Sequence, residues 1–466
     1  MTAGRTRGAA LALLLTFAAA GSLLAHAVLR HSRPAAGARL TTPPLELRLS
    51  FSEAPELAET TVALLDARGD TVALGPLARP ERLTIVAPIA GTLSPGDYTV
   101  LWHTAAADGH ATHGRFGFTV LAPAGSAPLS PPAGPAAGRV TGPAPPPVAH
   151  GVIPASEESA FGVGSPAYVV IRWLLFCALL AAVGAVAFRL FVLGAVRRRP
   201  RGAAAGLEPA LARRAAALGL AAAVVVVLAA LARLVAESYA LHGAAHAFDP
   251  ARIGTLLRST VWGRGWLVQI AAAVLAGVAF ALARRGGAAA WALAALAALA
   301  LAASPALTGH AAAAPRLTAL AVVADTGHVL GAAGWLGSLL TLLLVALPGA
   351  DDHGATVAEL VHAFSPTALF FAGLTVSSGV FSAWLHVGSV AALGSSTYGR
   401  TLLVKLAVVA LTAATGAYNW LRVRPALGTQ AASRRLRRSG TLELLVAVAV
   451  LLVTAILVAL PTPVSQ

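Results

Sequence analysis

The chain has 466 residues and a formal net charge of +15, with 57% hydrophobic and only 11% charged residues. This composition excludes an ordinary soluble protein, in which about 25% of residues are charged, so most of the chain is expected to lie in a lipid bilayer. The positive charge comes from short arginine clusters between apolar stretches, without interleaved aromatic residues. The charge therefore indicates membrane topology, and we expect no nucleic-acid partner.

Residues 1–25 have the three parts of a secretory signal peptide, namely two early arginines, an apolar run over 9–20 and small residues at the end. The cleavage point is open. A cut after Ala27 fits the small-x-small rule, whereas a cut after Ala25 leaves His26 as the new N-terminus. In either case, the next domain is expected outside the cytoplasm.

Residues 26–121 contain short segments in which apolar and polar residues alternate, separated by Gly, Pro and Asp turns. This pattern predicts a small antiparallel β-sandwich. Residues 122–164 are rich in Pro, Gly, Ala and Ser and predict an extended tether that lets the sandwich swing across the membrane face. The strands are expected at 45–51, 61–65, 83–86, 98–102 and 116–120.

Residues 165–461 hold eight apolar stretches long enough to span a bilayer, which takes about 20 residues. The arginine-rich loops at 197–214, 284–285 and 422–438 all fall on one side, which the positive-inside rule makes cytoplasmic. We therefore predict an all-α, eight-helix bundle in a bacterial inner membrane, with the N-terminal domain on the outer side. The spans are expected at 168–194, 215–240, 265–284, 287–307, 318–346, 366–388, 400–421 and 441–460.

The segment 26–37, together with the motifs at 51–53, 96–100 and 107–110, resembles the copper-resistance protein C (CopC) family. The resemblance covers nearly all of residues 26–121. It implies a cupredoxin-like Greek-key sandwich, with Cu(II) as the bound ion and with ligands that carry over to His26, Asp108 and His110.

Elementary coordination chemistry agrees with this ligand set. A freed His26 offers its α-amine and a ring nitrogen, and His110 with Asp108 would complete three nitrogens and one oxygen, which suit tetragonal Cu(II). Because the α-amine must lose its proton, binding should weaken in acid. The single cysteine, Cys177, allows no thiolate cluster, and Met1 is the only methionine, so thioether ligation is excluded. The alternative interpretation is an ordinary turn and a frayed terminus.

Residues 325–337, 398–405 and 417–420 resemble the copper-resistance protein D (CopD) family. That resemblance covers roughly 165–460. The order of the two halves, a CopC-like domain followed by a CopD-like one, strengthens both interpretations and indicates a CopC–CopD fusion.

Five histidines are expected in the outer half of the membrane region or at its edge. His242 and His246 follow the second span, His310 lies just outside the fourth, His386 is near the outer end of the sixth, and His328 lies about ten residues into the fifth. Ionisable groups in lipid are costly and usually functional.

Asp325 lies three residues before His328, so the two share a helix face. We expect His310 and His386 to receive copper, and Asp325 with His328 to pass it inward. The alternative is that the edge histidines are interfacial and that His328 hydrogen-bonds a neighbouring helix. Glu237 and Lys405 either form an intramembrane pair or each reach toward the outer surface, which is favoured for Lys405.

These observations predict a copper-binding and copper-transporting membrane protein that is not an enzyme, with copper import as its expected role. One alternative is a resistance factor or chaperone that hands copper to a membrane oxidase without transport. The other is a histidine-brace copper oxidoreductase, which the acidic Asp108 disfavours because it would occupy a position that oxygen chemistry needs.

Overall fold

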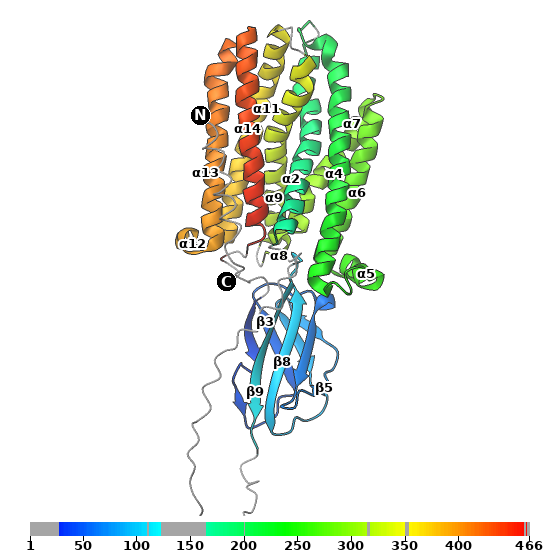
Figure 1. Cartoon of the computed structure of the whole chain (residues 1–466), viewed down its shortest axis with the longest axis vertical. Coiled ribbons are helices and arrows are strands. Elements are labelled where there is room, and N and C mark those ends of the chain that lie inside the picture. Colours follow the sequence, from blue (N-terminus) through cyan, green and yellow to red (C-terminus); the bar gives the residue numbers. More distant parts are fainter. Residues whose placement is uncertain are drawn as a thin grey trace, which may run out of the picture.

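The computed structural model describes residues 28–109, 111–122, 165–199, 201–314, 317–349, 354–460 and 463. The described residues form a β-sandwich that is docked against one end of a long helical bundle (Figure 1). The predicted signal peptide, nearly all of the predicted tether, His26 and His110 lie outside the described residues.

The sandwich consists of two sheets whose pairings are antiparallel, except for the parallel pair β2–β9. All five predicted strands are present, and the unpredicted β1, β2, β5 and β6 are at most five residues long. The first sheet has the order β1 (Leu29–Arg33), β3 (Glu46–Phe51), β7 (Thr84–Pro88), β6 (Ala78–Glu81). The second has the order β2 (Arg39–Leu40), β9 (Ala111–Val120), β8 (Gly96–Ala105), β4 (Thr61–Leu65), β5 (Thr71–Val72).

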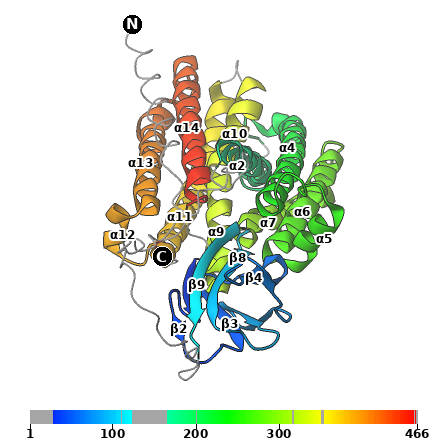
Figure 2. The same ribbon diagram turned by 60° about the horizontal axis from the view of Figure 1, so that its bottom comes forward.

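The alternation in β3 places Leu47, Leu49 and Phe51 in the core, where each is almost fully buried. Trp102 packs edge-to-face on Phe51, with 5.3 Å between the ring centroids. Burying a side chain of this kind contributes about 1.5–3 kcal/mol. The long hairpin of β8 and β9 packs on this core and carries residues 106–109, at its tip, toward the bundle (Figure 2).

The described chain contains eight helical segments that are long and apolar enough to cross a membrane, as the sequence predicts. Several continue beyond their α-helical part through π-helical turns, so the spans run to 20 residues or more. Their α-helices are α2 (Pro166–Ala187), α4 (Glu208–His242), α6 (Val261–Ala283), α7 (Ala288–Leu307), α9 (Thr318–Ala332), α11 (Gly354–Val387), α13 (Thr397–Tyr418) and α14 (Gln430–Leu457).

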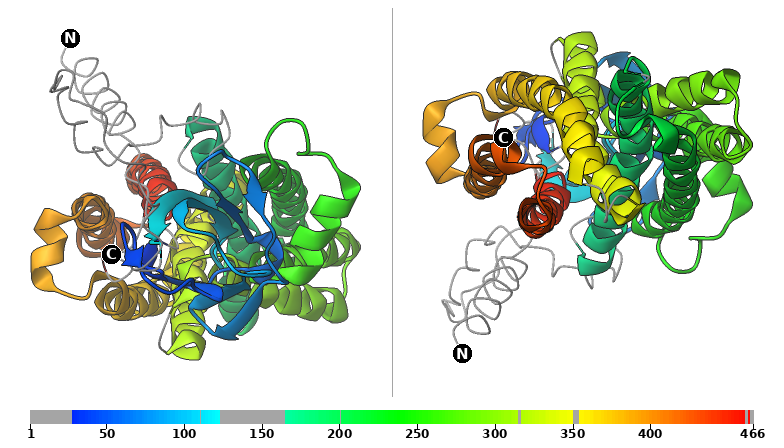
Figure 3. Two further views of the ribbon diagram at one scale, coloured as in Figure 1. Left: turned by 90° about the horizontal axis from the view of Figure 1, so that it is seen from below. Right: turned by 90° about the horizontal axis from the view of Figure 1, so that it is seen from above.

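The sandwich end of the bundle is also where the short helices α5 (Pro250–Ser259), α8 (His310–Ala313) and α12 (Val390–Ser395) lie (Figure 1). Seen along the bundle, the sandwich covers only part of this end, and the orange helices α12 and α13 lie to one side of it (Figure 3). The arginine-rich loops join helices at the opposite end.

Candidate metal site at the domain interface

Two carboxylates of the sandwich hold helices of the bundle. Glu56 Oε1 accepts a hydrogen bond from the backbone N–H of Val261 at 2.6 Å, at the start of α6, where unpaired N–H groups favour a negative charge. Burial raises the pKa of Glu56, and this hydrogen bond partly offsets the effect. Glu59 Oε2 accepts from His242 Nε2 at 3.1 Å. Both carboxylates are buried, so the sandwich is seated on the bundle at these points.

The turn after β8 provides a third contact, which involves the predicted copper ligand Asp108. The Asp108 side chain is fully buried, and its Oδ2 accepts a hydrogen bond from Nδ1 of His310, the first residue of α8, at 2.9 Å. Burial lowers the pKa of His310, but the hydrogen bond to Asp108 and its negative charge outweigh burial, so the pKa is raised. The structure thus brings together one residue from each of the two predicted copper sites.

Gly109 allows this close approach. Its φ of +92° is a conformation that side-chain-bearing residues rarely adopt. A Cβ at this position would lie 2.5 Å from Glu237 Oε1 and 2.7 Å from Trp262 Cδ1. Glycine is therefore required both by the backbone conformation and by the space between the turn and helices α4 and α6.

His386, near the end of α11, lies beside His310, with 6.4 Å between the ring centroids. Its Nδ1 donates to the carbonyl oxygen of Ser382 at 2.8 Å. A carbonyl only accepts, so Nδ1 carries a proton, and in the neutral ring the lone pair is then on Nε2, which is one of the two ring nitrogens that can bind a metal. Nε2 is buried and has no hydrogen-bond partner among the described residues.

Asp325 and His328 lie deeper, on α9. His328 Nδ1 donates to the carbonyl oxygen of Thr375 on α11 at 3.0 Å, which again leaves the lone pair on Nε2. The hydrogen bond to a neighbouring helix, foreseen as an alternative, is therefore present. Asp325 is close enough to Lys405 on α13, and to His310, for their charges to interact.

Of the two alternatives for Glu237 and Lys405, the intramembrane pair is not found, because Glu237 is held by another residue. Glu237 accepts a hydrogen bond from Tyr168 Oη at 2.5 Å, and Arg233 Nε donates to the same Tyr168 oxygen at 3.3 Å. Arg233 also donates to the carbonyl oxygen of Thr308 at 3.2 Å. Charged residues inside apolar stretches are a usable signal for such a network, but they do not show which residues pair.

The two histidines after the second span do not share a helix face. The α4 helix ends at His242 because Gly243, with a φ of +71°, caps it, so His246 does not continue the helical face and is exposed. His242 is held by Glu59. Within the described ranges, no three His, Cys, Asp or Glu residues are grouped as a metal site, and the predicted ligands His26 and His110 lie outside these ranges.

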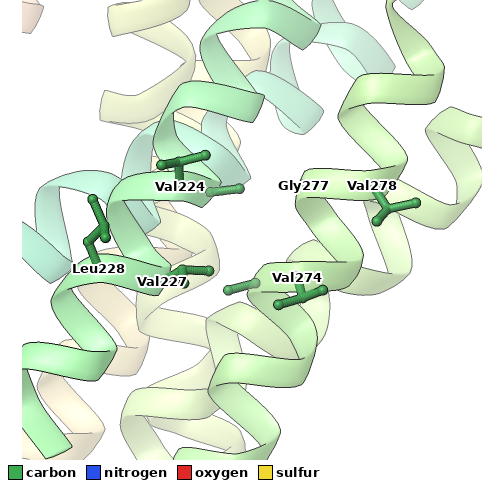
Figure 4. Close-up of a pocket in the computed structure, with 8 residues that line it drawn as sticks. Val224, Val227, Leu228, Val274, Gly277 and Val278 are labelled. Atoms are coloured by element: carbon green, nitrogen blue, oxygen red, sulfur yellow. The ribbon is translucent and has the colours of Figure 1, made fainter.

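A groove between α4 and α6 lies apart from these residues (Figure 4). Only alanine, valine, leucine and glycine line it, including Val224, Leu228 and Val274. A groove without nitrogen or oxygen side-chain ligands does not fit a metal ion.

Comparison with known proteins gives matches along most of the chain. Residues 29–121 match the CopC domain, residues 163–318 the Copper resistance protein D-like N-terminal domain, and residues 358–457 Copper resistance protein D. The chain is 26% identical over 453 residues to Copper transport protein CutJ of Bacillus subtilis (strain 168), covering 94% of this chain and 75% of that protein. It is 37% identical over 113 residues to Protein YobA of Escherichia coli (strain K12), covering 24% of this chain and 91% of that protein.

Similar solved structures include CopC from Methylosinus trichosporium OB3b, which is 26% identical and matches 21% of this chain and 94% of its own, with a TM-score of 0.19. PcoC from Escherichia coli is 26% identical over 21% of this chain and 99% of its own, also with a TM-score of 0.19. The resemblance predicted from the sequence is thus confirmed in both halves by the family matches. The chain belongs to the copper-resistance protein families as a CopC domain fused to a multi-pass CopD membrane domain.

Proposed function

We propose that this protein captures Cu(II) outside the cytoplasm and passes it through the membrane bundle for import. The membership of both halves in copper-related families supports copper as the cargo. The capture site consists of His26, Asp108 and His110, which supply nitrogen and oxygen donors suited to Cu(II).

The contact between Asp108 and His310 carries the proposal. A carboxylate of the capture site already touches a histidine of the bundle, and His386 lies beside that histidine. Copper held at the turn therefore has a second set of donors within reach. Transfer proceeds by stepwise exchange of ligands, so the ion leaves one donor as it gains another and avoids bulk water.

The inner part of the path uses Asp325 and His328. Both His328 and His386 donate Nδ1–H to a backbone carbonyl, which fixes each ring and leaves Nε2 with its lone pair. Asp325 adds a carboxylate one helical turn nearer the sandwich. The three side chains form a series of donors from the interface into the bundle.

The arginine-rich loops support the orientation. They lie at the bundle end opposite the sandwich, and positive loops stay in the cytoplasm, so the sandwich faces outward from a bacterial inner membrane. Docking also disfavours oxidoreductase activity, because the Asp108 turn is buried against the bundle and presents no open face to a large substrate.

The test is cellular copper content with the chain expressed or deleted, measured at limiting external copper. Import predicts higher copper on expression and lower copper on deletion. Unchanged content, or lower content on expression, would contradict import. A fall in membrane oxidase activity on deletion, with cellular copper unchanged, would instead identify a delivery factor.

A further inference from the structure

Glu443 is a buried carboxylate that the proposed copper path does not use. It is 4% exposed and lies on α14, thirteen residues after Gln430 and fourteen before Leu457. The first turns of α14 carry arginines up to Arg438, which are expected in the cytoplasm. At about 1.5 Å per residue, Glu443 lies about 7.5 Å beyond Arg438, in the cytoplasmic part of the span expected at 441–460. A carboxylate buried between the helices of a membrane bundle is costly and is usually retained for a function.

Two neutral side chains hold this carboxylate. Trp335 Nε1 donates to Oε1 at 3.2 Å, and Asn419 Nδ2 donates to Oε2 at 3.0 Å. In the described part of the chain, no ion pair to Glu443 is found. The titratable groups on the elements packed against α14 are Arg172 and Cys177 on α2, Lys405 and Tyr418 on α13, Arg422 beyond it, and Glu359, His362 and His386 on α11. Glu443 therefore has no cation to balance its charge there.

Both donors lie in irregular helix segments. Trp335 is in the π-helical turn η4 (Ala333–Gly337), and Asn419 begins the π-helical turn η7 (Asn419–Val423). Single π-turns within α-helices are frequently found at functional sites. A Cβ on Gly416 would lie 3.3 Å from Glu443 Oε1, so α13 approaches the carboxylate closely at that glycine.

The side-chain amide of Asn419 can form a hydrogen bond with Glu443 whether Glu443 is ionised or protonated. In the structure its Nδ2 donates to the carboxylate, while Oδ1 is buried and has no partner among the described residues. A protonated Glu443 has an O–H to donate, and the amide turned by half a rotation would accept it through Oδ1. Each state of Glu443 thus has a matching orientation of Asn419.

We propose that Glu443 is a proton-binding site, held by Trp335 and Asn419, whose occupancy is coupled to passage of the metal ion through the bundle. The proton-binding part stands on this geometry alone, whereas the coupling part rests on the proposed copper transport. Binding a proton removes the uncompensated charge from the apolar interior, and releasing it restores the charge.

The proton site is tested without copper, by infrared difference spectroscopy of the full chain in detergent between acid and neutral pH. We expect a carboxylic-acid C=O band that Glu443→Gln abolishes, since the carboxamide resembles the protonated acid in shape. Glu208→Gln is the control, because Glu208 pairs with Arg189 at 3.4 Å at the arginine-rich end, and it should keep the band. A spectrum unchanged by Glu443→Gln overturns the proposal.

If Glu443→Gln does not fold, Trp335→Phe keeps the proposal testable, since it removes one donor and should shift the pH midpoint of the band. An unshifted midpoint contradicts the assignment of the band to Glu443.

Coupling between proton binding and metal passage is tested by copper uptake into vesicles at several pH values. The uptake of the unsubstituted chain should vary with pH and that of Glu443→Gln should not, whereas equal profiles overturn the coupling. If the unsubstituted chain takes up no copper, the proposed function and the coupling fail together, and the infrared result still decides the proton site.

Discussion

The carboxylate of Asp108 on the sandwich and the imidazole of His310 on the membrane bundle lie 2.9 Å apart, although the two residues are 202 positions apart in the chain. The turn that carries Asp108 is fixed by the β8–β9 hairpin, and His310 is fixed at the start of α8. A capture domain and a membrane path that meet through one hydrogen bond suit transfer of an ion by ligand exchange.

Replacing His310 by alanine should lower cellular copper accumulation by at least about tenfold at limiting copper, because removing even an outer-shell partner of a metal ligand typically costs roughly 10–100-fold and His310 is proposed as a direct ligand. Cu(II) binding by the sandwich should persist. The measurement is cellular copper content, with the amount of membrane-inserted protein held equal.

The matched control is His246→Ala, since His246 is exposed and lies beyond the end of α4. It should leave accumulation unchanged. Equal losses in both variants, or no loss in His310→Ala, would contradict a path through His310.

Gly109→Ala should loosen the docking of the sandwich. The new methyl group is strained at a φ of +92° and clashes with Glu237 and Trp262, so the cost is about 1–3 kcal/mol. Hydrogen exchange should rise at the tip of the β8–β9 hairpin.

Gly91→Ala is the control for this substitution. Gly91 has the same φ of +92°, but nothing lies within 4 Å of its added Cβ. Gly91→Ala should therefore introduce the same backbone strain but leave the sandwich docked on the bundle. If both variants increase hydrogen exchange at the hairpin tip equally, the effect of Gly109→Ala comes from backbone strain alone. Contact of residue 109 with the bundle would then not be needed for docking.

The sandwich should lose stability in mild acid through His103. Burial lowers the pKa of His103, and the positive charge of His113, its partner across the β8–β9 pair, lowers it further. The unfolded chain takes up this proton near pH 6.5, before the folded chain does. Stability is therefore constant above about 6.5 and falls as the pH drops toward the folded pKa.

Hydrogen exchange of the β8 and β9 amides at pH 7.5 and 5.5 measures this effect. The His103→Gln variant should show a smaller loss between these pH values than the unsubstituted chain, whereas His31→Gln, at an exposed position, should not differ from it. The same loss in His103→Gln as in the unsubstituted chain would refute the assignment.

Cu(II) binding should depend on a free His26. The mature chain that starts at His26 should give a stoichiometric Cu(II) signal by electron paramagnetic resonance, and the signal should weaken in acid as the amine gains a proton. A chelator should remove it. A chain that starts at residue 27 or 28 lacks both nitrogens of His26, so an equal signal from that chain would exclude the proposed ligand set.

The elements could be predicted from the sequence because their signals are local. Alternation gives strands such as β4, and eight apolar stretches give the spans. The short edge strands β2 and β5 have two residues each and leave no periodic pattern.

The contacts between distant segments could not be predicted in this way. The resemblance to known families suggests Asp108 as a copper ligand, and the position of His310, an ionisable residue at the membrane edge, suggests that it is functional. Neither signal places the two residues in contact. The pairing of Glu237 with Tyr168 instead of Lys405 was missed for the same reason, because the two residues are 69 positions apart and only the packing of α2 on α4 joins them.

Copper uptake by vesicles that contain only this protein, with the sandwich facing outward, tests the central claim most directly. We expect that Cu(II) added outside appears in the lumen. Because losing even an outer-shell partner of a metal ligand typically costs roughly 10–100-fold, replacing both His310 and His386 by alanine should reduce the rate of entry by at least about tenfold. Copper that stays bound outside, or that enters equally fast through the doubly substituted protein, would contradict transfer from the Asp108 turn into the bundle.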